Sequence, residues 1–175
     1  ELKKRYNSQV VGFEGDKNRI PEIDILVKDK QIWKKDNFEA KIYHVPGHTS
    51  GHIAFYFFKQ KKIFTGDTLF SLGCGRIFEG TYRQMFSSLN KIKKLPKNTE
   101  IYCGHEYTLQ NSNFCMANDS RNLKLQRKII KIKEKLKNNL PTMPSVLIDE
   151  IECNIFLKAK DLKSFSKLRD LKDNF

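Results

Sequence analysis

Three short segments each place a potential metal-binding side chain after an apolar run and a glycine. His48 stands in Val-Pro-Gly-His-Thr-Ser-Gly-His, Asp67 in Phe-Thr-Gly-Asp-Thr, and His105 in Tyr-Cys-Gly-His-Glu. Each residue alone has an ordinary explanation, because a histidine after a strand often only forms a hydrogen bond and an aspartate often begins a turn. Loops at strand ends are also where ligands converge. Two imidazoles and a carboxylate, presented three times in the same local form, therefore indicate a zinc or iron site.

Six apolar runs predict the β-strands that would carry these segments. The runs are rich in Val, Ile, Phe and Tyr, as strands commonly are. They cover residues 9–13, 23–27, 40–45, 53–58, 62–65 and 100–103. The polar residues 59–61, between the fourth and fifth runs, predict a hairpin turn.

Helical patterns follow the strands. Thr81 and Gln84 form a capping box that begins a helix, and Pro96 ends the apolar spacing of that helix. Further helices are predicted at residues 109–118, 122–138 and 162–172. Strands first and helices afterward predict an α/β domain at residues 1–105 and a helical domain at residues 106–175.

The chain carries an excess of positive charge. Its 175 residues include 33 Lys or Arg against 20 Asp or Glu, a formal net charge of +13. Residues 121–139 contain eight of the Lys or Arg residues and a single acidic residue. The same stretch carries an apolar stripe of Leu125, Ile129, Ile132 and Leu136, spaced as on one face of a helix. Because this stretch has no aromatic residue, a solvated basic helix face is favoured over a nucleic-acid footprint. No apolar run approaches the roughly 18 residues of a membrane-spanning helix.

The four cysteines indicate no metal knuckle and no disulfide framework. Cys74, Cys103, Cys115 and Cys153 are scattered and form no Cys-x-x-Cys pair. Reduced thiols and a cytoplasmic location are therefore expected.

The three segments around His48, Asp67 and His105 resemble the later motifs of the metallo-β-lactamase superfamily. Their flanks, Asp-Thr-Leu-Phe-Ser-Leu-Gly-Cys-Gly-Arg-Ile-Phe-Glu-Gly and Gly-His-Glu-Tyr-Thr, resemble glyoxalase II, the hydroxyacylglutathione hydrolase family. So do Asn-Leu-Pro-Thr-Met-Pro-Ser at residues 139–145 and the last eight residues, Leu-Arg-Asp-Leu-Lys-Asp-Asn-Phe. The resemblance implies an α/β fold, an αββα sandwich lacking its N-terminal part, followed by a helical glutathione-binding domain.

The resemblance also implies a set of site residues. His48 would bind the first of two divalent metal ions, His105 would bind the second, and Asp67 would bridge them. Zinc is the expected metal, and the same ligands accept iron or manganese. The glutathione part of the substrate would be contacted by Arg76, His105, Tyr107, Arg169 and Lys172. Some relatives have Lys-x-Tyr where this chain has Arg-Ile-Phe, so a tyrosine hydroxyl is lost at Phe78.

Three neighbouring residues are expected to play supporting parts. His52 would orient the ligand loop through a hydrogen bond and would not bind metal. His44 matches no functional position and is interpreted as structural. Cys74 lies between two glycines near the site, but a hydroxide on the metal ions would already serve as the nucleophile, so no nucleophilic role is expected for this thiol.

The implied function is hydrolysis of S-D-lactoylglutathione to glutathione and D-lactate, a step of methylglyoxal detoxification. A glutathione thiolate can leave without a strong general acid, and its carboxylates would meet cations at Arg76, Arg169 and Lys172. A monomer is expected, with a small-molecule partner and neither a nucleic-acid nor a membrane partner.

One expected motif does not occur in these residues. The family also uses Thr-His-x-His-x-Asp-His, whereas the only histidines here are at 44, 48, 52 and 105. Three ligands do not hold two catalytic zinc ions. With no initiator Met, the chain is expected to be an N-terminally truncated fragment that is inactive alone. The alternatives are another hydrolase of the same fold, such as a nuclease using the basic helix, and an inactive remnant that binds glutathione conjugates.

Overall fold

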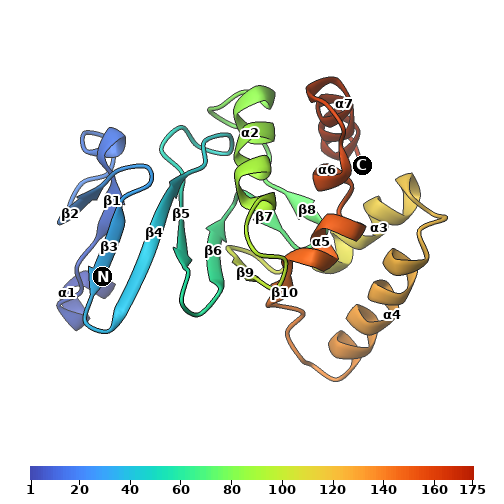
Figure 1. Ribbon diagram of the computed structural model, residues 1–175, viewed down its shortest axis with the longest axis horizontal. Coiled ribbons are helices and arrows are strands. Elements are labelled where there is room, and N and C mark those ends of the chain that lie inside the picture. Colours follow the sequence, from blue (N-terminus) through green and yellow to red (C-terminus); the bar gives the residue numbers. More distant parts are fainter.

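A computed structural model describes all 175 residues, Glu1–Phe175. The chain is built around one mixed six-stranded β-sheet. Its six strands are β3 (Ile32–Lys35), β4 (Phe38–His44), β5 (Ile53–Phe57), β6 (Lys62–Gly66), β9 (Glu100–Cys103) and β10 (Ser145–Val146). Their order is β10-β9-β6-β5-β4-β3, with β6 and β9 parallel and every other pair antiparallel. Figure 1 shows this sheet running from β3 near the N-terminus to the C-terminal helices.

Smaller elements flank the sheet. The N-terminal segment forms α1 (Leu2–Tyr6), β1 (Val11–Phe13), a 3-10 turn (Glu14–Asp16) and β2 (Ile25–Val27), with β1 and β2 parallel. The hairpin of β7 (Leu69–Phe70) and β8 (Gly73–Cys74) follows β6 directly. Its turn contains Leu72, whose side chain is buried and whose backbone is in the left-handed region, at φ 57°.

The helix α2 (Tyr82–Lys93) packs against one face of the sheet. It begins with the expected capping box, in which Thr81 accepts from the Gln84 backbone N–H. Its apolar stripe, including Met85 and Leu89, is buried in one cluster with Ala54 of β5 and Ile63 of β6. Alternation along β5 and β6 turns these side chains toward the helix.

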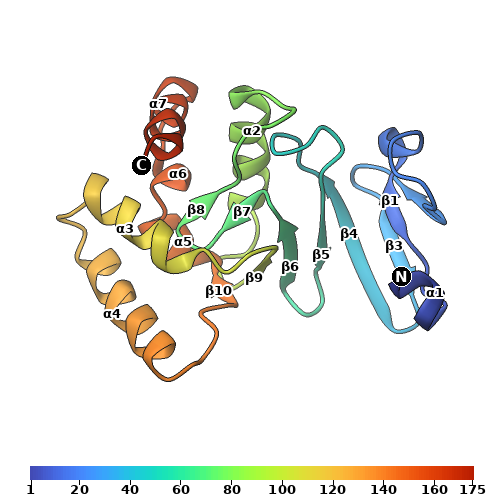
Figure 2. The ribbon, with the colours of Figure 1, turned by 180° about the vertical axis from the view of Figure 1, so that it is seen from behind.

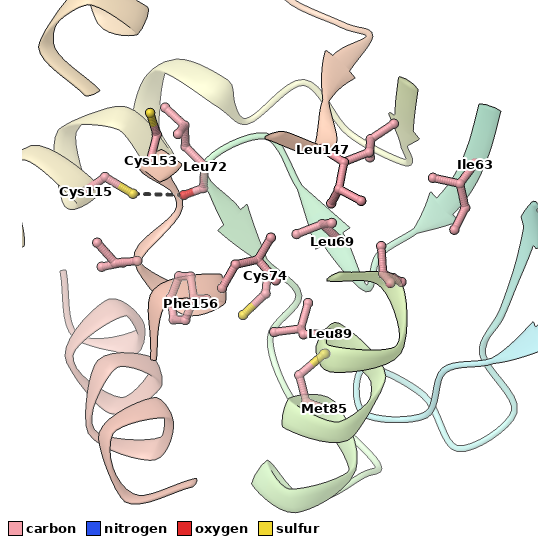
Figure 3. Packing of buried hydrophobic residues seen from close by; sticks show 14 of the residues in the cluster. Ile63, Leu69, Leu72, Cys74, Met85, Leu89, Cys115, Leu147, Cys153 and Phe156 are labelled. Carbon is pink, nitrogen blue, oxygen red and sulfur yellow. Dashed lines mark hydrogen bonds between the residues drawn. The ribbon is translucent and has the colours of Figure 1, made fainter. Parts of the chain in front are cut away.

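The C-terminal helices gather beyond the β9–β10 end of the sheet, as both ribbon views show (Figures 1 and 2). They are α3 (Thr108–Asn118), α4 (Leu123–Lys137), α5 (Leu147–Cys153), α6 (Ile155–Lys158) and α7 (Leu162–Asp173). Side chains from α3 to α7 share one apolar cluster with α2 and the sheet. Figure 3 shows part of this cluster, including Cys115 of α3, Cys153 of α5 and Phe156 of α6. The two parts of the chain therefore have a common core. No helix has the length and apolar character needed to cross a membrane.

The opposite sheet face carries a row of aromatic rings. Trp33 contacts Phe55 edge-on, and Phe57, Phe64 and Tyr102 continue the row through edge and stacked contacts. The Phe64 side chain remains 46% exposed, so this face is only partly covered within the chain.

The mixed α/β class, the six strand positions, the hairpin and the four marked helices are confirmed within a few residues. The strands β3, β7, β8 and β10 and the helices α1, α5 and α6 were not expected. Most are too short to show a hydrophobic period, because two to five residues complete at most one or two repeats. The β7–β8 turn is instead held by a side chain distant in the sequence, Glu150.

Candidate metal and substrate site

The loop after β4 presents His48. Its Nδ1 lies 2.8 Å from the carbonyl oxygen of Arg76. Because a carbonyl can only accept, Nδ1 carries a proton and donates it, which leaves Nε2 as the ring nitrogen that can bind a metal ion. That Nε2 lies 3.4 Å from Oδ2 of Asp67. Gly47 is at φ +150°, where a Cβ would meet Met85 of α2, so glycine lets the loop approach the helix.

An ionic network supports the same loop. Arg19 donates to Ser50 Oγ at 2.5 Å and to Glu79 Oε1 at 2.6 Å. Glu79 also accepts from the Ser50 backbone N–H at 2.8 Å. The N-terminal segment and the segment before α2 are therefore tied to the His48 loop.

The loop after β6 presents Asp67, and His52 fixes its backbone. The Asp67 N–H donates to Nε2 of His52 at 3.0 Å, so the hydrogen bond expected of His52 is present. Burial lowers the pKa of His52, which favours the neutral ring that can accept this bond. Gly66 precedes Asp67 at φ +50°, where a Cβ would press on the His52 ring.

His105 reaches the same place because β9 runs parallel to β6. The carboxyl ends of the two strands lie side by side, and the Gly104 N–H donates to the Gly66 carbonyl at 2.9 Å. His105 Nε2 lies 3.5 Å from Asp67 Oδ2. Its ring stacks on Tyr107 with centroids 5.0 Å apart.

The structure thus brings His48, Asp67 and His105 together from three separate loops. Both imidazole Nε2 atoms face one carboxylate oxygen, and these donor types suit zinc, iron or manganese. No group of three or more His, Cys, Asp or Glu side chains in the chain is arranged to hold a metal ion by itself. The donor types fit a metal centre, and the ligand shell within these residues is partial.

A pocket of about 470 Å³ opens beside these three side chains. It lies between the α/β part of the chain and the C-terminal helices, and residues of both parts form its walls. The predicted substrate residues Arg76, Tyr107, Arg169 and Lys172 all line it. Phe78, the position of the lost tyrosine hydroxyl, lines it too, as do Phe70 and Asp173, to which sequence reasoning assigned no role.

Asp173 organises the cations in this pocket. Its Oδ1 accepts from Arg76 Nε at 3.2 Å and from Arg169 Nη2 at 2.8 Å. The Arg76 side chain is 57% exposed and keeps its Nη atoms for other partners. Lys172 is half-buried with its ammonium over the Phe114 ring, and burial lowers its pKa.

Arg169 differs from the other cations because it is buried. Its Nη1 donates to the Cys74 carbonyl at 2.9 Å, and its Nη2 donates to Asp173. The guanidinium is thus engaged mainly with the β7–β8 hairpin and α7. Its Nε is buried without a protein partner.

The surroundings of Cys74 and His44 are those of structural residues. Burial raises the pKa of the Cys74 thiol to about 11, which disfavours the thiolate that a nucleophile requires. His44 stacks on Phe13 with centroids 4.1 Å apart, and its Nε2 donates to the Ser50 carbonyl. Both observations agree with the interpretation from sequence.

The chain matches two known families in succession. Residues 13–105 match the metallo-beta-lactamase superfamily, and residues 106–175 match the family described as hydroxyacylglutathione hydrolase C-terminus. Among solved structures, the chain is similar to ETHE1 from Myxococcus xanthus, with a TM-score of 0.68 and 22% identity. That match covers 97% of this chain and 60% of the ETHE1 chain, and it supports the fold alone.

Two curated relatives are much closer in sequence. A hydroxyacylglutathione hydrolase of Pelagibacter ubique is 64% identical over all 175 residues, which span 73% of that protein. A hydroxyacylglutathione hydrolase of Prochlorococcus marinus is 47% identical over 95% of this chain and 68% of its own length. The chain therefore belongs to the hydroxyacylglutathione hydrolase family, within the metallo-β-lactamase superfamily. Membership of this superfamily implies binding of divalent metal.

Proposed function

We propose that this protein hydrolyses the thioester of S-D-lactoylglutathione, giving glutathione and D-lactate. The observation that carries the proposal is the convergence of His48, Asp67 and His105 beside a pocket edged with cations. The names of the two relatives support the same substrate class.

The three converging side chains would hold two divalent metal ions, zinc by preference. His48 would bind one ion, His105 would bind the other, and Asp67 would bridge them. When bound, the ions would activate a water molecule and polarise the thioester carbonyl. The His48 Nδ1 bond to Arg76 would keep the Nε2 lone pair directed at the metal. Further ligands are required, because three side chains do not complete two sites.

The pocket residues would bind the glutathione part. Arg76 and Lys172 are the cations best placed to meet its carboxylates, since Arg76 is exposed and Lys172 is half-buried at the pocket wall. The Tyr107 hydroxyl and the exposed face of His105 would add contacts. Arg169 would act mainly by holding the loop between Asp67 and Arg76, because its guanidinium is already bonded. Phe78 offers a ring where some relatives offer a hydroxyl.

The division into residues 1–105 and 106–175 assigns the metal-binding residues to the first part and most of the glutathione contacts to the second. A cytoplasmic location is part of the proposal, supported by four free cysteines, three of them buried. A monomer is proposed as well. No nucleic-acid or membrane partner is proposed. The basic helix α4 is partly neutralised by Lys124–Glu152 and Lys128–Glu150 ion pairs, which disfavours a nuclease.

The test is a substrate comparison with the full-length product of the source gene, loaded with zinc. Hydrolysis of S-D-lactoylglutathione is expected, with no cleavage of RNA at the same protein concentration. Calorimetry with glutathione on the 175-residue chain separates the remnant alternative: binding by the chain together with no thioesterase activity in the full-length protein would favour it.

A further inference from the structure

The β7–β8 turn is held almost entirely by side chains from the C-terminal helices. The Leu72 carbonyl accepts from Cys115 Sγ of α3 at 3.1 Å, a contact drawn in Figure 3. Asn111 of α3 donates to the Ser71 carbonyl, and Asn154 donates to the Gly73 carbonyl. Because these groups are buried, each bond replaces one to water and fixes the turn in a single conformation.

Glu150 of α5 is the centre of this arrangement. Its side chain is fully buried and accepts four hydrogen bonds. Oε1 accepts from Ser71 Oγ at 3.2 Å and from Lys128 Nζ at 3.0 Å. Oε2 accepts from the Leu72 N–H at 2.7 Å and from Asn154 Nδ2 at 3.2 Å. All four partners donate here, and all except the Ser71 hydroxyl can only donate, so a carboxylate satisfies the site completely.

The turn leads directly to the backbone that orients His48. Gly75 follows β8 and packs so closely on the Asp67 carbonyl that a Cβ there would overlap it. The next residue, Arg76, supplies the carbonyl that accepts the His48 Nδ1 proton at 2.8 Å. Only three residues separate Leu72, which Glu150 holds, from Arg76, so a displacement of the turn is passed on to this carbonyl.

We propose that Glu150 is a positioning residue: by bonding Ser71 and Leu72 it holds the β7–β8 turn so that the Arg76 carbonyl fixes the orientation of His48. The consequence for catalysis rests on the proposed function, whereas the effect on the His48 ring does not. Glu150 touches neither the pocket nor the three converging side chains. Its influence on the ligand therefore passes through the turn.

The charge of Lys128 makes a sharp variant pair possible. In Glu150→Gln the amide nitrogen takes the place of one carboxylate oxygen, and at either position it faces a donor that cannot accept. In addition, Lys128, whose side chain is 13% exposed, loses its main counter-charge. With Lys128→Met added, the amide can donate to Ser71 Oγ while its oxygen accepts from Leu72 and Asn154. The double variant is therefore expected to restore the turn that the single variant disturbs.

The first readout is the imidazole nitrogen spectrum of His48 in the 175-residue chain, by ¹⁵N–¹H NMR without metal. Wild type should show a protonated Nδ1 in a hydrogen bond to the Arg76 carbonyl. Glu150→Gln should shift the Nδ1 signals as the contact with the Arg76 carbonyl is disturbed, and the double variant should return them to their wild-type positions. Ile132→Ala removes buried volume from α4 away from the turn, and it should lower stability while leaving the His48 signals unchanged.

The second readout is steady-state hydrolysis by the full-length, zinc-loaded protein. Glu150→Gln should lower kcat by about 10–100-fold, the usual cost of losing support for a metal ligand, with KM within about twofold. The double variant should recover most of kcat. His48 signals that stay at their wild-type positions in folded Glu150→Gln would overturn the inference. Failure of the double variant to restore the wild-type His48 signals would also overturn it. This second criterion applies even if the single variant does not fold. Absence of thioesterase activity in wild type would instead contradict the proposed function alone.

Discussion

At the scale of single residues, the site depends on hydrogen bonds that fix the ring orientations of His48 and His52. His52 accepts from the Asp67 N–H through Nε2, so it serves the backbone of the candidate bridging residue. Replacing His52 by Ala should leave that N–H without its partner, at a cost of about 1–3 kcal/mol in the free energy of unfolding. Zinc bound per full-length protein should fall as well. Urea unfolding and metal analysis measure both, with His44→Ala as the control whose zinc content should stay unchanged.

The buried thiols predict that the folded state loses stability at alkaline pH. Burial raises the pKa of Cys115 to about 12 and that of Cys153 to about 11, above the ordinary value of 9. A raised folded-state pKa means that the folded chain keeps protons that the unfolded chain loses above pH 9. The free energy of unfolding should therefore fall as pH rises from 9 toward 11, by about 1.4 kcal/mol per pH unit for each such thiol. Urea titrations at pH 8, 9 and 10 check this, and Cys115→Ala should flatten the slope; an unchanged free energy across this range would contradict it.

At the scale of elements, the capping box of α2 sets where that helix begins. Thr81 accepts from the Gln84 N–H, while Gln84 Oε1 accepts from the Thr81 N–H at 2.9 Å. Thr81→Ala should lower the free energy of unfolding by about 1 kcal/mol. Ser87→Ala, on the exposed face of the same helix, is the matched control and should cost nothing. Equal urea midpoints for the two variants would mean that the cap does not support the fold.

The elements also show what the sequence can and cannot specify. Apolar runs such as that of β5 and the capping box of α2 are local patterns, so they predict their elements well. The parallel pairing of β6 with β9 joins residues nearly forty positions apart, and no local pattern announces it. The role of Glu150 is harder still to predict from the sequence. This residue stands beside Asp149 in what resembles a solvated first helical turn, and only its four buried partners distinguish it.

At the scale of the whole molecule, the two parts of the chain share a core and a pocket. The cluster that includes Ile63 of the sheet and Phe165 of α7 is continuous, and the pocket between the parts has walls from each. The sequence predicted which cations line this pocket. It could not predict that Arg169 would be buried against Cys74 or that Asp173 would join two arginines, because both follow from the packing of α7.

This arrangement predicts different consequences for two arginines. Arg76→Ala removes an exposed pocket cation, so KM for S-D-lactoylglutathione should rise by roughly tenfold, as for the loss of a charged hydrogen bond, with kcat changed much less. Arg127→Ala removes the same charge from α4, outside the pocket, and should leave both constants unchanged. Equal effects would mean that general charge, rather than a pocket contact, attracts the substrate.

The central claim is that His48, Asp67 and His105 form the metal-binding core of a thioesterase. The most direct test compares hydrolysis of S-D-lactoylglutathione by the full-length, zinc-loaded protein with hydrolysis by its Asp67→Asn variant, alongside their zinc contents. Wild type should cleave the thioester, and Asp67→Asn should lose at least 100-fold in rate together with bound zinc. Wild-type rate and zinc content in the variant would contradict the account.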